Sequence, residues 1–403
     1  MKKFLTVFLA VALVVCMFAA CGQQQQPEPA APEVSDEEAA AAVDELIAAI
    51  QVQERTEETD AQCLAAREAW DALTDAQKEL VEEGDYFALD TGDASKDDPL
   101  NQDEIGENEL LVVSFGTSFN DSRVADIGGV EKALQEAYPE WSVRRAFTAQ
   151  IIINHVQSRD GEFIDNMDQA LQRAVDNGVK NLVIQPTHLM HGAEYDELVG
   201  QAEAYKDNFE SMIIAEPLLG EVGNDATVIN TDKETVAKAV AAEAVAAAGA
   251  DSIDALKADG TAIVLMGHGT SHTANVTYSQ MQAQMAALGY DNVFIGTVEG
   301  KPAETAFPEV KKALEEAGYT KVILRPLMVV AGDHANNDMA ADEEGTWYYG
   351  FVNGGEFEVE GADGPVDTGA GLGAENVTCQ IAGLGRIADI QALYVAHVAA
   401  VLQ

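Results

Sequence analysis

Three side chains that bind transition metals lie in short glycine-containing segments of the sequence. His268 stands in GHGTS, His334 in GDHANND and Glu194 in GAEY. Imidazole nitrogens suit Co²⁺, Fe²⁺ and Ni²⁺, and a carboxylate adds negative charge without the strong grip of a thiolate. The three residues therefore form a candidate site for a divalent first-row ion.

Each of these residues also has a plain structural interpretation. His268 could hydrogen-bond its own turn, His334 could cap a loop, and Glu194 could be a solvated carboxylate at a helix start. Weaker candidates for auxiliary ligands or proton transfer are His188, His191, His272, Glu299 and Asp333. The residue types alone leave these alternatives open.

An internal repeat relates two of the three candidates. LVVSFGTS at 111–118 matches VLMGHGTS at 264–271, which aligns Phe115 with His268. VKNLVIQP at 179–186 matches YTKVILRP at 319–326, and continuing without a gap aligns Glu194 with His334. Open α/β sheets bind ligands beyond the carboxyl ends of their strands. The repeat therefore predicts two duplicated halves whose loops surround one site.

Alternating strands and helices position these loops. Short apolar runs followed by helical stretches indicate an α/β fold in which mostly parallel sheets are flanked by helices on both faces. We expect one half over 109–258 and the other over 259–403. The predicted strands are 110–115, 142–148, 181–186, 211–216, 262–266, 292–297 and 321–326.

Six blocks of sequence carry a family resemblance. VVSFGTS, RRAFTAQIII, IQPTHLMHGAEY, LMGHGTSH, GTVEGKP and PLMVVAGDHANNDMA closely resemble the sirohydrochlorin cobaltochelatases of anaerobic cobalamin synthesis, which are class II chelatases related to ferrochelatase. The resemblance implies two Rossmann-like halves related by duplication, with a tetrapyrrole between them. It further implies ATP-independent insertion of a divalent metal substrate, with Co²⁺ preferred and Fe²⁺ or Ni²⁺ as alternatives.

The resemblance assigns metal binding and catalysis to His268, His334 and Glu194. His268 is also the expected proton acceptor, because the ordinary pKa of imidazole lies near neutrality. The expected contacts to the tetrapyrrole, for which burial and structural pairing remain an alternative, are Arg144, Arg145, Ser114 and Thr117. The sequence has no GxxxxGK[ST] motif, so we expect no nucleotide cofactor.

The first residues resemble a bacterial lipoprotein signal. Lys2 and Lys3 precede an apolar run over 4–20, and small residues then precede Cys21. We expect a signal over 1–21, lipid on Cys21, a tether over 22–34, and an exported protein anchored to the extracytoplasmic side of a membrane. A cleaved signal peptide and an uncleaved anchor are the alternatives.

A small all-α module is expected between the tether and the α/β core. Ser35 with Glu38, and Thr74 with Gln77, have the spacing of capping boxes within 35–89. The acidic segment over 90–108 is predicted to be a linker. A chain that begins near Asp103 should then fold and keep all metal chemistry.

The charge balance excludes one class of partner. The chain has 23 Lys and Arg against 69 Asp and Glu, a net charge of −46, which repels nucleic-acid phosphates. An exported location also raises a second hypothesis, an extracytoplasmic lipoprotein that binds metal, haem or another tetrapyrrole without turnover. The sequence leaves the oligomeric state open, a homo-oligomer included.

Overall fold

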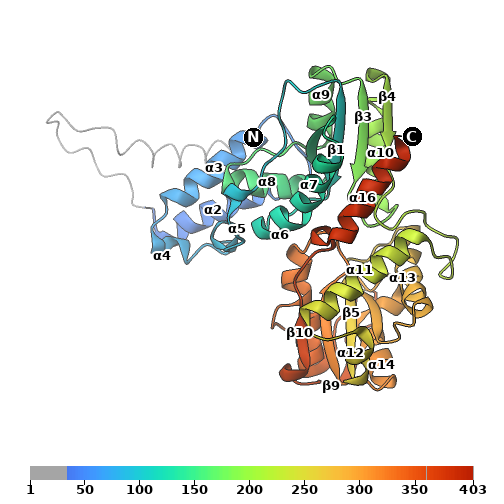
Figure 1. Ribbon diagram of the computed structural model, residues 1–403. Coiled ribbons are helices and arrows are strands. Elements are labelled where there is room, and N and C mark those ends of the chain that lie inside the picture. Colours follow the sequence, from blue (N-terminus) through green and yellow to red (C-terminus); the bar gives the residue numbers. More distant parts are fainter. Residues whose placement is uncertain (1–33, 360, 403) are drawn as a thin grey trace, which may run out of the picture. The chain divides into compact units, whose positions relative to one another are not determined.

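The computed structural model describes residues 34–359 and 361–402, which form two compact units (Figure 1). Of the described residues, the first unit comprises those up to Asp90 together with Gln150–Phe163, and the second comprises Thr91–Ala149 and those from Ile164 onward. Among the described residues, no helix is long and apolar enough to cross a membrane. The predicted signal and Cys21 lie outside the described residues.

The first unit is all helical. Its helices are α2 (Asp36–Ile50), α3 (Thr59–Ala72), α4 (Asp75–Lys78), α5 (Asp85–Ala88) and α8 (Gln150–Asp160). Both capping boxes are present: the Ser35 side chain accepts the Glu38 N–H at the start of α2, and the Thr74 side chain accepts the Gln77 N–H at the start of α4. These caps satisfy backbone donors that the first helical turn leaves unpaired.

Helix α8 comes from the middle of the chain but folds with the N-terminal helices. The Asn154 side-chain amide donates to the Ile50 carbonyl at 2.9 Å, and His155 Nε2 lies 2.6 Å from the Tyr86 carbonyl. The rings of Tyr86 and His155 stack with centroids 3.8 Å apart. The module predicted over 35–89 therefore also includes α8.

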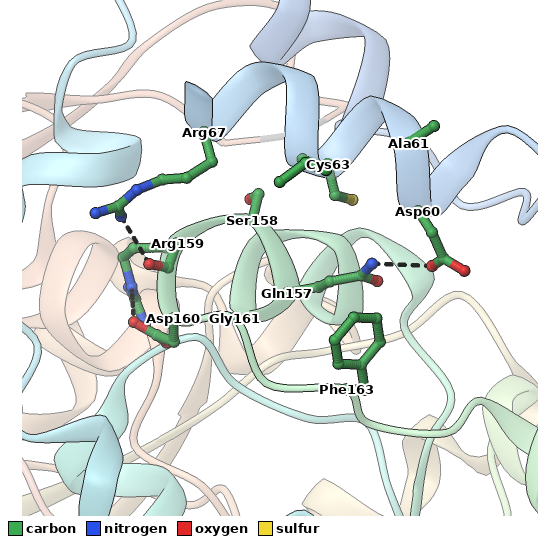
Figure 2. Close-up of a pocket in the computed structure, with 11 residues that line it drawn as sticks. Asp60, Ala61, Cys63, Arg67, Gln157, Ser158, Arg159, Asp160, Gly161 and Phe163 are labelled. Atoms are coloured by element: carbon green, nitrogen blue, oxygen red, sulfur yellow. Dashed lines mark hydrogen bonds and ion pairs between the residues drawn. The ribbon is translucent and has the colours of Figure 1, made fainter. Parts of the chain in front are cut away.

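A cavity of about 600 Å³ lies between α3 and α8 (Figure 2). Leu64 and Phe163 line it with more than half of each residue exposed. Two hydrogen bonds join α3 to α8 beside this cavity: Arg67 donates to the Arg159 carbonyl at 2.7 Å, and Gln157 donates to the Asp60 carboxylate at 2.9 Å.

The second unit contains two four-stranded parallel sheets. The first has the order β2-β1-β3-β4 and the second has the order β10-β7-β5-β6. Their strands are β1 (Asn108–Ser114), β2 (Ser142–Phe147), β3 (Asn181–Pro186), β4 (Ser211–Ile214), β5 (Thr261–Gly267), β6 (Val293–Thr297), β7 (Lys321–Pro326) and β10 (Val377–Cys379). The repeat matches β1 to β5 and β3 to β7. Read from its other edge, the second sheet has the order β6-β5-β7-β10, which is the order of the first sheet. The α/β class and the duplication are confirmed.

Helices cover both faces of each sheet, as the uninterrupted apolar strands require. On β1, Leu110 and Val112 belong to one buried cluster, and Leu111 and Val113 belong to another on the opposite face. The helices are α6 (Asn120–Ser122), α7 (Gly128–Ala137), α9 (Met167–Asp176), α10 (Ala193–Glu203), α11 (Thr231–Ala247), α12 (Ile253–Ala258), α13 (Val276–Ala287), α14 (Phe307–Glu316), α15 (Trp347–Asn353) and α16 (Ala388–Val401).

Short elements complete the second unit. Two are π-helical turns, η3 (Arg123–Ile127) and η7 (Ala335–Met339). An antiparallel hairpin joins β8 (Gly354–Phe357) to β9 (Val366–Ala370). The 3₁₀ turns are η2 (Ala94–Lys96), η4 (Lys206–Asn208), η5 (Thr273–Asn275), η6 (Ala303–Thr305), η8 (Ala374–Asn376) and η9 (Leu384–Arg386).

The acidic segment before β1 packs into the second unit and differs from the predicted linker. Asp97, whose side chain is 2% exposed, lies 2.6 Å from the Arg123 guanidinium and 2.6 Å from that of Arg145. Leu100 is buried, and its carbonyl accepts the Arg145 N–H at 3.1 Å. A chain beginning at Asp103 would lack this carboxylate, which the buried Arg123 and Arg145 share, whereas a chain beginning at Thr91 would keep it.

Candidate metal centre

The two candidate imidazoles lie against each other within the second unit. The ring centroids of His268 and His334 are 4.6 Å apart, and the planes meet at 71°. His268 directly follows β5, and His334 immediately precedes the π-helical turn η7. Two residues that are 66 positions apart in sequence are therefore brought together by the ends of neighbouring strands β5 and β7.

Backbone geometry fixes the turn that carries His268. Gly269 has φ +94°, a left-handed conformation that glycine adopts without strain, and its N–H donates to the Tyr278 hydroxyl at 3.1 Å. A Cβ on Gly267 would lie 2.4 Å from the Tyr278 ring, so the close packing of this ring requires glycine. Burial raises the pKa of Tyr278 to about 12, which keeps its hydroxyl neutral.

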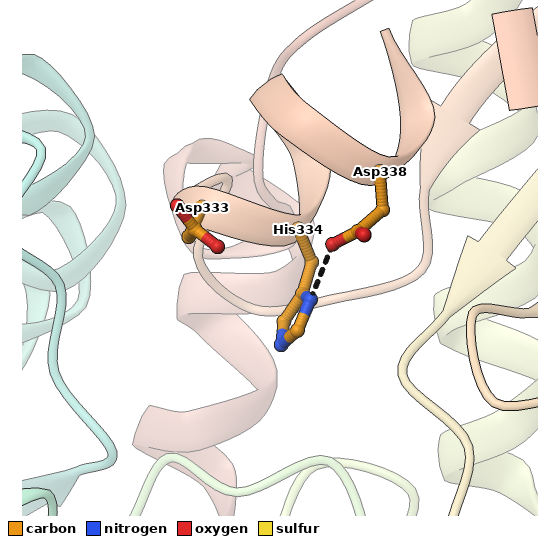
Figure 3. Close-up of side chains that lie close together, drawn as sticks. All are labelled: Asp333, His334 and Asp338. Carbon is orange, nitrogen blue, oxygen red and sulfur yellow. Dashed lines mark hydrogen bonds and ion pairs between the residues drawn. The ribbon is translucent and has the colours of Figure 1, made fainter. Parts of the chain in front are cut away.

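Each imidazole donates its Nδ1–H to an oxygen. His268 Nδ1 lies 2.8 Å from the Gly269 carbonyl, and His334 Nδ1 lies 2.7 Å from the Asp338 carboxylate (Figure 3). Both oxygens accept hydrogen bonds, which assigns the proton to Nδ1 and the lone pair to Nε2 in the neutral rings. Metal-binding histidines have this arrangement, in which the second ring nitrogen donates to a carbonyl or carboxylate.

Two aspartates accompany His334. One ligand atom from each of Asp333, His334 and Asp338 lies within 4.8 Å of the other two. The hydrogen bond that His334 donates to Asp338 raises the pKa of His334, against the opposing effect of desolvation. Asp338 is a residue whose role the sequence analysis missed, although its position four residues after His334 is a signal for a side-chain pair on one helical face.

Two carboxylates flank the imidazoles from different elements. Glu299 follows β6, and its Oε1 lies 3.7 Å from His268 Nδ1. Glu194 lies in the first turn of α10 with 55% of its side chain exposed. Desolvation raises the pKa of Glu194, and the positive field of the His268 imidazole opposes this rise. Glu299 therefore lies beside Nδ1 of His268, and the charge of the same ring acts to lower the pKa of Glu194.

The sequence matches one family over most of its length. A profile of the cobalt chelatase (CbiK) family matches residues 108–403. The chain belongs to this cobalt chelatase family. The match begins at the first strand of the second unit, so α2 to α5 lie before it.

Curated relatives agree with this assignment. The sirohydrochlorin cobaltochelatase of Salmonella typhimurium is 32% identical over 291 residues, which cover 72% of this chain and 94% of the relative. The sirohydrochlorin cobaltochelatase CbiKC of Nitratidesulfovibrio vulgaris is 30% identical over 241 residues, which cover 59% of this chain and 77% of the relative. The protein is a metal chelatase enzyme of the cobalt chelatase family.

A solved structure is similar at lower identity. SirB from Bacillus subtilis with Fe³⁺ has 13% sequence identity, a TM-score of 0.46, and coverage of 73% of this chain and 95% of its own. The family assignment rests on the sequence matches, and the fold class rests on the strand order of the two sheets.

A further histidine lies buried beside Glu194 in the chelatase. His188 Nε2 is 3.9 Å from Glu194 Oε2, and the His188 side chain is 5% exposed. Burial lowers the pKa of His188 to about 4, so this ring is neutral near pH 7. Among the described residues, neither of its ring nitrogens has a hydrogen-bond partner. Nearby, His272 Nε2 lies 3.3 Å from the Asp196 carboxylate of α10.

The structure places two of the predicted contacts to a tetrapyrrole, Arg144 and Arg145, inside the protein. Arg144 is fully buried and paired with Glu109 and Asp165, and Arg145 is 1% exposed and paired with Glu131 and Asp97. A buried guanidinium needs counterions inside the protein, and these two already have them. Both guanidinium groups are therefore neutralised by carboxylates inside the protein.

Ser114 and Thr117 also lie inside the protein. The Ser114 hydroxyl is 2.6 Å from the hydroxyl of Thr187, and Ser114 is 1% exposed. The Thr117 hydroxyl accepts the Phe119 N–H at 3.1 Å. A Cβ on Gly332 would lie 2.7 Å from Thr117 Oγ1, so Thr117 packs against the loop that carries His334. Both residues contribute to the packing of the strand-end loops, and their predicted contact with a tetrapyrrole stays a prediction.

Proposed function

We propose that this chelatase inserts a divalent metal ion into sirohydrochlorin or a closely related tetrapyrrole without ATP, with Co²⁺ preferred over Fe²⁺ and Ni²⁺. The observation that carries the proposal is the pair of imidazoles 4.6 Å apart, each with Nδ1 donating to an oxygen. The names of the curated relatives support the choice of metal and macrocycle.

The proposed reaction exchanges one ion for two protons. Nε2 of His268, Nε2 of His334 and one carboxylate hold the ion and leave coordination positions for pyrrole nitrogens. When the ion passes to the macrocycle, two pyrrole N–H protons are released. The His268 lone pair that held the ion is then free to accept one of them, because imidazole has the pKa for this role near pH 7, and the second proton passes to water.

We propose Glu194 as the third ligand. Glu299 faces the Nδ1 edge of His268 at 3.7 Å, which suits a residue that orients this ring. The charge of the same imidazole opposes the rise in the Glu194 pKa that desolvation causes, and so favours the ionised form that can bind a metal. The two carboxylates can be separated by experiment, because each can be changed to its neutral isostere.

The test is a comparison of Glu194→Gln and Glu299→Gln in the full chain. Anaerobic mixtures with sirohydrochlorin and Co²⁺ are followed by the absorbance change of the macrocycle. Loss of a ligand should lower the insertion rate by about 100-fold, the upper end of the losses for outer partners of a metal site. We expect this loss for Glu194→Gln, a smaller loss for Glu299→Gln and none for the control Glu197→Gln on the same helix.

Two outcomes would change the proposal. A larger loss in Glu299→Gln than in Glu194→Gln would make Glu299 the ligand. Tight Co²⁺ binding by the unaltered chain with no turnover of any tetrapyrrole would contradict the chelatase proposal and favour a binding protein.

We also propose that the chelatase is exported and held at the extracytoplasmic side of a membrane by lipid on Cys21. The basis is the sequence before residue 34, where two lysines, an apolar run and small residues precede this cysteine. Cys21→Ser should release the protein from membranes or leave the precursor uncleaved. Unchanged processing with unchanged membrane association, measured by fractionation and mass spectrometry, would contradict the proposal.

A further inference from the structure

A buried carboxylate in the N-terminal half of the core holds the loop that leads to His334. Asp126 is 0% exposed and lies in the π-helical turn η3. Its Oδ2 accepts the Ala331 N–H at 2.9 Å, and its Oδ1 accepts from the Arg386 guanidinium. Ala331 stands only three residues before His334.

The same loop is held at a second point. The Ser122 hydroxyl donates to the Ala331 carbonyl at 2.6 Å, so both backbone polar groups of Ala331 bond to residues from the other half of the duplication. Gly332 packs against Thr117, where an added Cβ would lie 2.7 Å from the Thr117 hydroxyl. The chain before His334 is therefore fixed in both hydrogen bonding and packing.

The chain beyond Ala331 is braced internally, which carries this fixation to the imidazole. The Asn336 side-chain amide donates to the Gly332 carbonyl at 2.8 Å, and the Asn337 amide donates to Asp333 at 2.6 Å. His334 lies between these two contacts. A shift at Ala331 would consequently move the His334 ring relative to His268.

Arg386 and two glycines let Asp126 remain buried. The charge of Asp126 is paired with Arg386, the last residue of η9, and Gly385 lies in the same turn. A Cβ on Gly383 would lie 2.4 Å from Asp126 Oδ2, and one on Gly385 would lie 2.4 Å from the Asp126 carbonyl. Glycine at both positions of the Gly383–Leu384–Gly385 segment therefore allows the chain to approach Asp126 closely.

We propose that Asp126 is a positioning residue for metal binding, which sets the place of His334 from the opposite half of the duplicated core. The inference rests on the proposed function, in which His334 is a ligand. Two features point to it independently of His334: the turn η3 is π-helical, a conformation frequent at functional sites, and its carboxylate is buried with bonds to two separate segments.

The test compares two substitutions at Asp126 with a matched buried carboxylate. Asp126→Ala removes the acceptor for Ala331, whereas Asp126→Asn keeps an oxygen that can accept the same N–H. Glu109→Ala is the control, because Glu109 is also fully buried and paired with an arginine, Arg144. For each full-length variant, Co²⁺ affinity is measured by calorimetry, ligand number by the visible spectrum of bound Co²⁺, and folding by circular dichroism.

We expect Asp126→Ala to lower Co²⁺ affinity by about 10–100-fold, the usual loss for an outer partner of a metal site, with an altered Co²⁺ spectrum. Asp126→Asn should recover most of this affinity, and Glu109→Ala should keep it while lowering the melting temperature. Unchanged affinity in Asp126→Ala, or an equal loss in Glu109→Ala, would overturn the inference.

Two further variants keep the test decisive. If Asp126→Ala does not fold, Ser122→Ala removes the other contact to Ala331 and should still weaken Co²⁺ binding, and unchanged affinity there would overturn the inference. His334→Ala in the same experiment separates the two claims. Full affinity in His334→Ala would refute the proposed metal site itself, whereas a loss there without a loss in the Asp126 variants would refute only the positioning role.

Discussion

The two halves of the duplicated core share a strand order but differ in where they keep their charged and polar groups. The first sheet contains Arg144 and Arg145 on β2, both buried and paired inside the protein. In the second half, His268 directly follows β5, the strand that repeats β1, and its side chain is 47% exposed; the first half has Phe115 at this position. Duplication therefore preserved the scaffold, while buried ion pairs stabilise one half and the imidazoles lie in the other.

The largest expected effect concerns the buried charges of the first half. Asp97→Ala removes the carboxylate shared by Arg123 and Arg145 and leaves both cations without it. Breaking a buried ion pair by removing one partner costs about 3–5 kcal/mol, and urea unfolding should show a loss of this size. Asp93→Ala, in the same segment but exposed, should leave the urea unfolding midpoint nearly unchanged. Equal losses in the two variants would show that the Asp97 pairs do not stabilise the fold.

The second effect concerns the two aspartates beside His334. Asp338 accepts from His334 Nδ1 at 2.7 Å, whereas Asp333 accepts from the Asn337 side chain at 2.6 Å. Asp338→Ala should lower Co²⁺ affinity by about 10–100-fold, because the His334 ring loses the hydrogen bond that fixes its orientation and its Nδ1–H tautomer. Asp333→Ala should have a smaller effect, measured by the same titration. The reverse order would indicate that Asp333 is the partner used when the metal is bound.

The third effect is a pH dependence that separates metal binding from stability. The hydrogen bond that His334 donates to Asp338 raises the pKa of His334. This pair therefore stabilises the fold fully below about pH 6.5 and loses that contribution as pH rises through the folded pKa. Metal binding has the opposite sign, since protons compete for the imidazole lone pair. Co²⁺ affinity should therefore fall as pH drops below the raised pKa.

Asp338→Asn provides the check on this interpretation. Without the carboxylate, the pKa of His334 should fall, and the midpoint of the affinity loss should move to lower pH. Titrations between pH 5.5 and 8.5 would show the shift. An affinity that does not change with pH across this range would exclude His334 as a ligand.

The smallest expected effect concerns surface pairs of the second half. Lys257 and Asp291 lie 2.6 Å apart, but their side chains are 39% and 62% exposed. Exposed pairs contribute about 0–1 kcal/mol and weaken with salt. Lys257→Ala should therefore leave the urea unfolding midpoint close to that of the unaltered protein. A loss as large as that of Asp97→Ala would contradict the distinction between buried and exposed charges.

The sequence predicted the scaffold well because apolar periodicity and repeats are local signals. Strands β3 and β7 have the predicted bounds, and the repeat places Phe115 and His268 at matching strand ends. The capping boxes of Ser35 and Thr74 were also predicted, since their spacing is fixed by the first turn of a helix.

The sequence could not predict which charged residues are paired in the interior. Arg144 and Arg145 are neighbours on a strand, and their charge alone is compatible with binding an acidic ligand. Only the positions of Glu109, Asp97 and Glu131 in the structure show that both are neutralised. Asp97 is more than 25 residues from each arginine it pairs with, so its acidic surroundings in sequence predicted a linker.

The same limit applies to helix α8 and to Asp126. The sequence around Asn154 is helical, but its partner Ile50 lies about a hundred residues earlier. The sequence therefore did not predict that α8 belongs to the first unit. Asp126 and Ala331 are 205 residues apart, and no motif relates them. Contacts of this length depend on tertiary packing, which a single sequence does not report.

The most direct test of the central claim is Co²⁺ titration of the double variant His268→Ala with His334→Ala, measured by calorimetry at pH 8 in the full chain. Removing both imidazoles should lower affinity by at least about 100-fold, more than the loss of an outer partner. Phe115→Ala, the matching position in the other half, should stay within about threefold of the unaltered protein, as expected for an exposed residue outside the site. Unchanged Co²⁺ affinity in the double variant would contradict the assignment of the metal centre to these imidazoles.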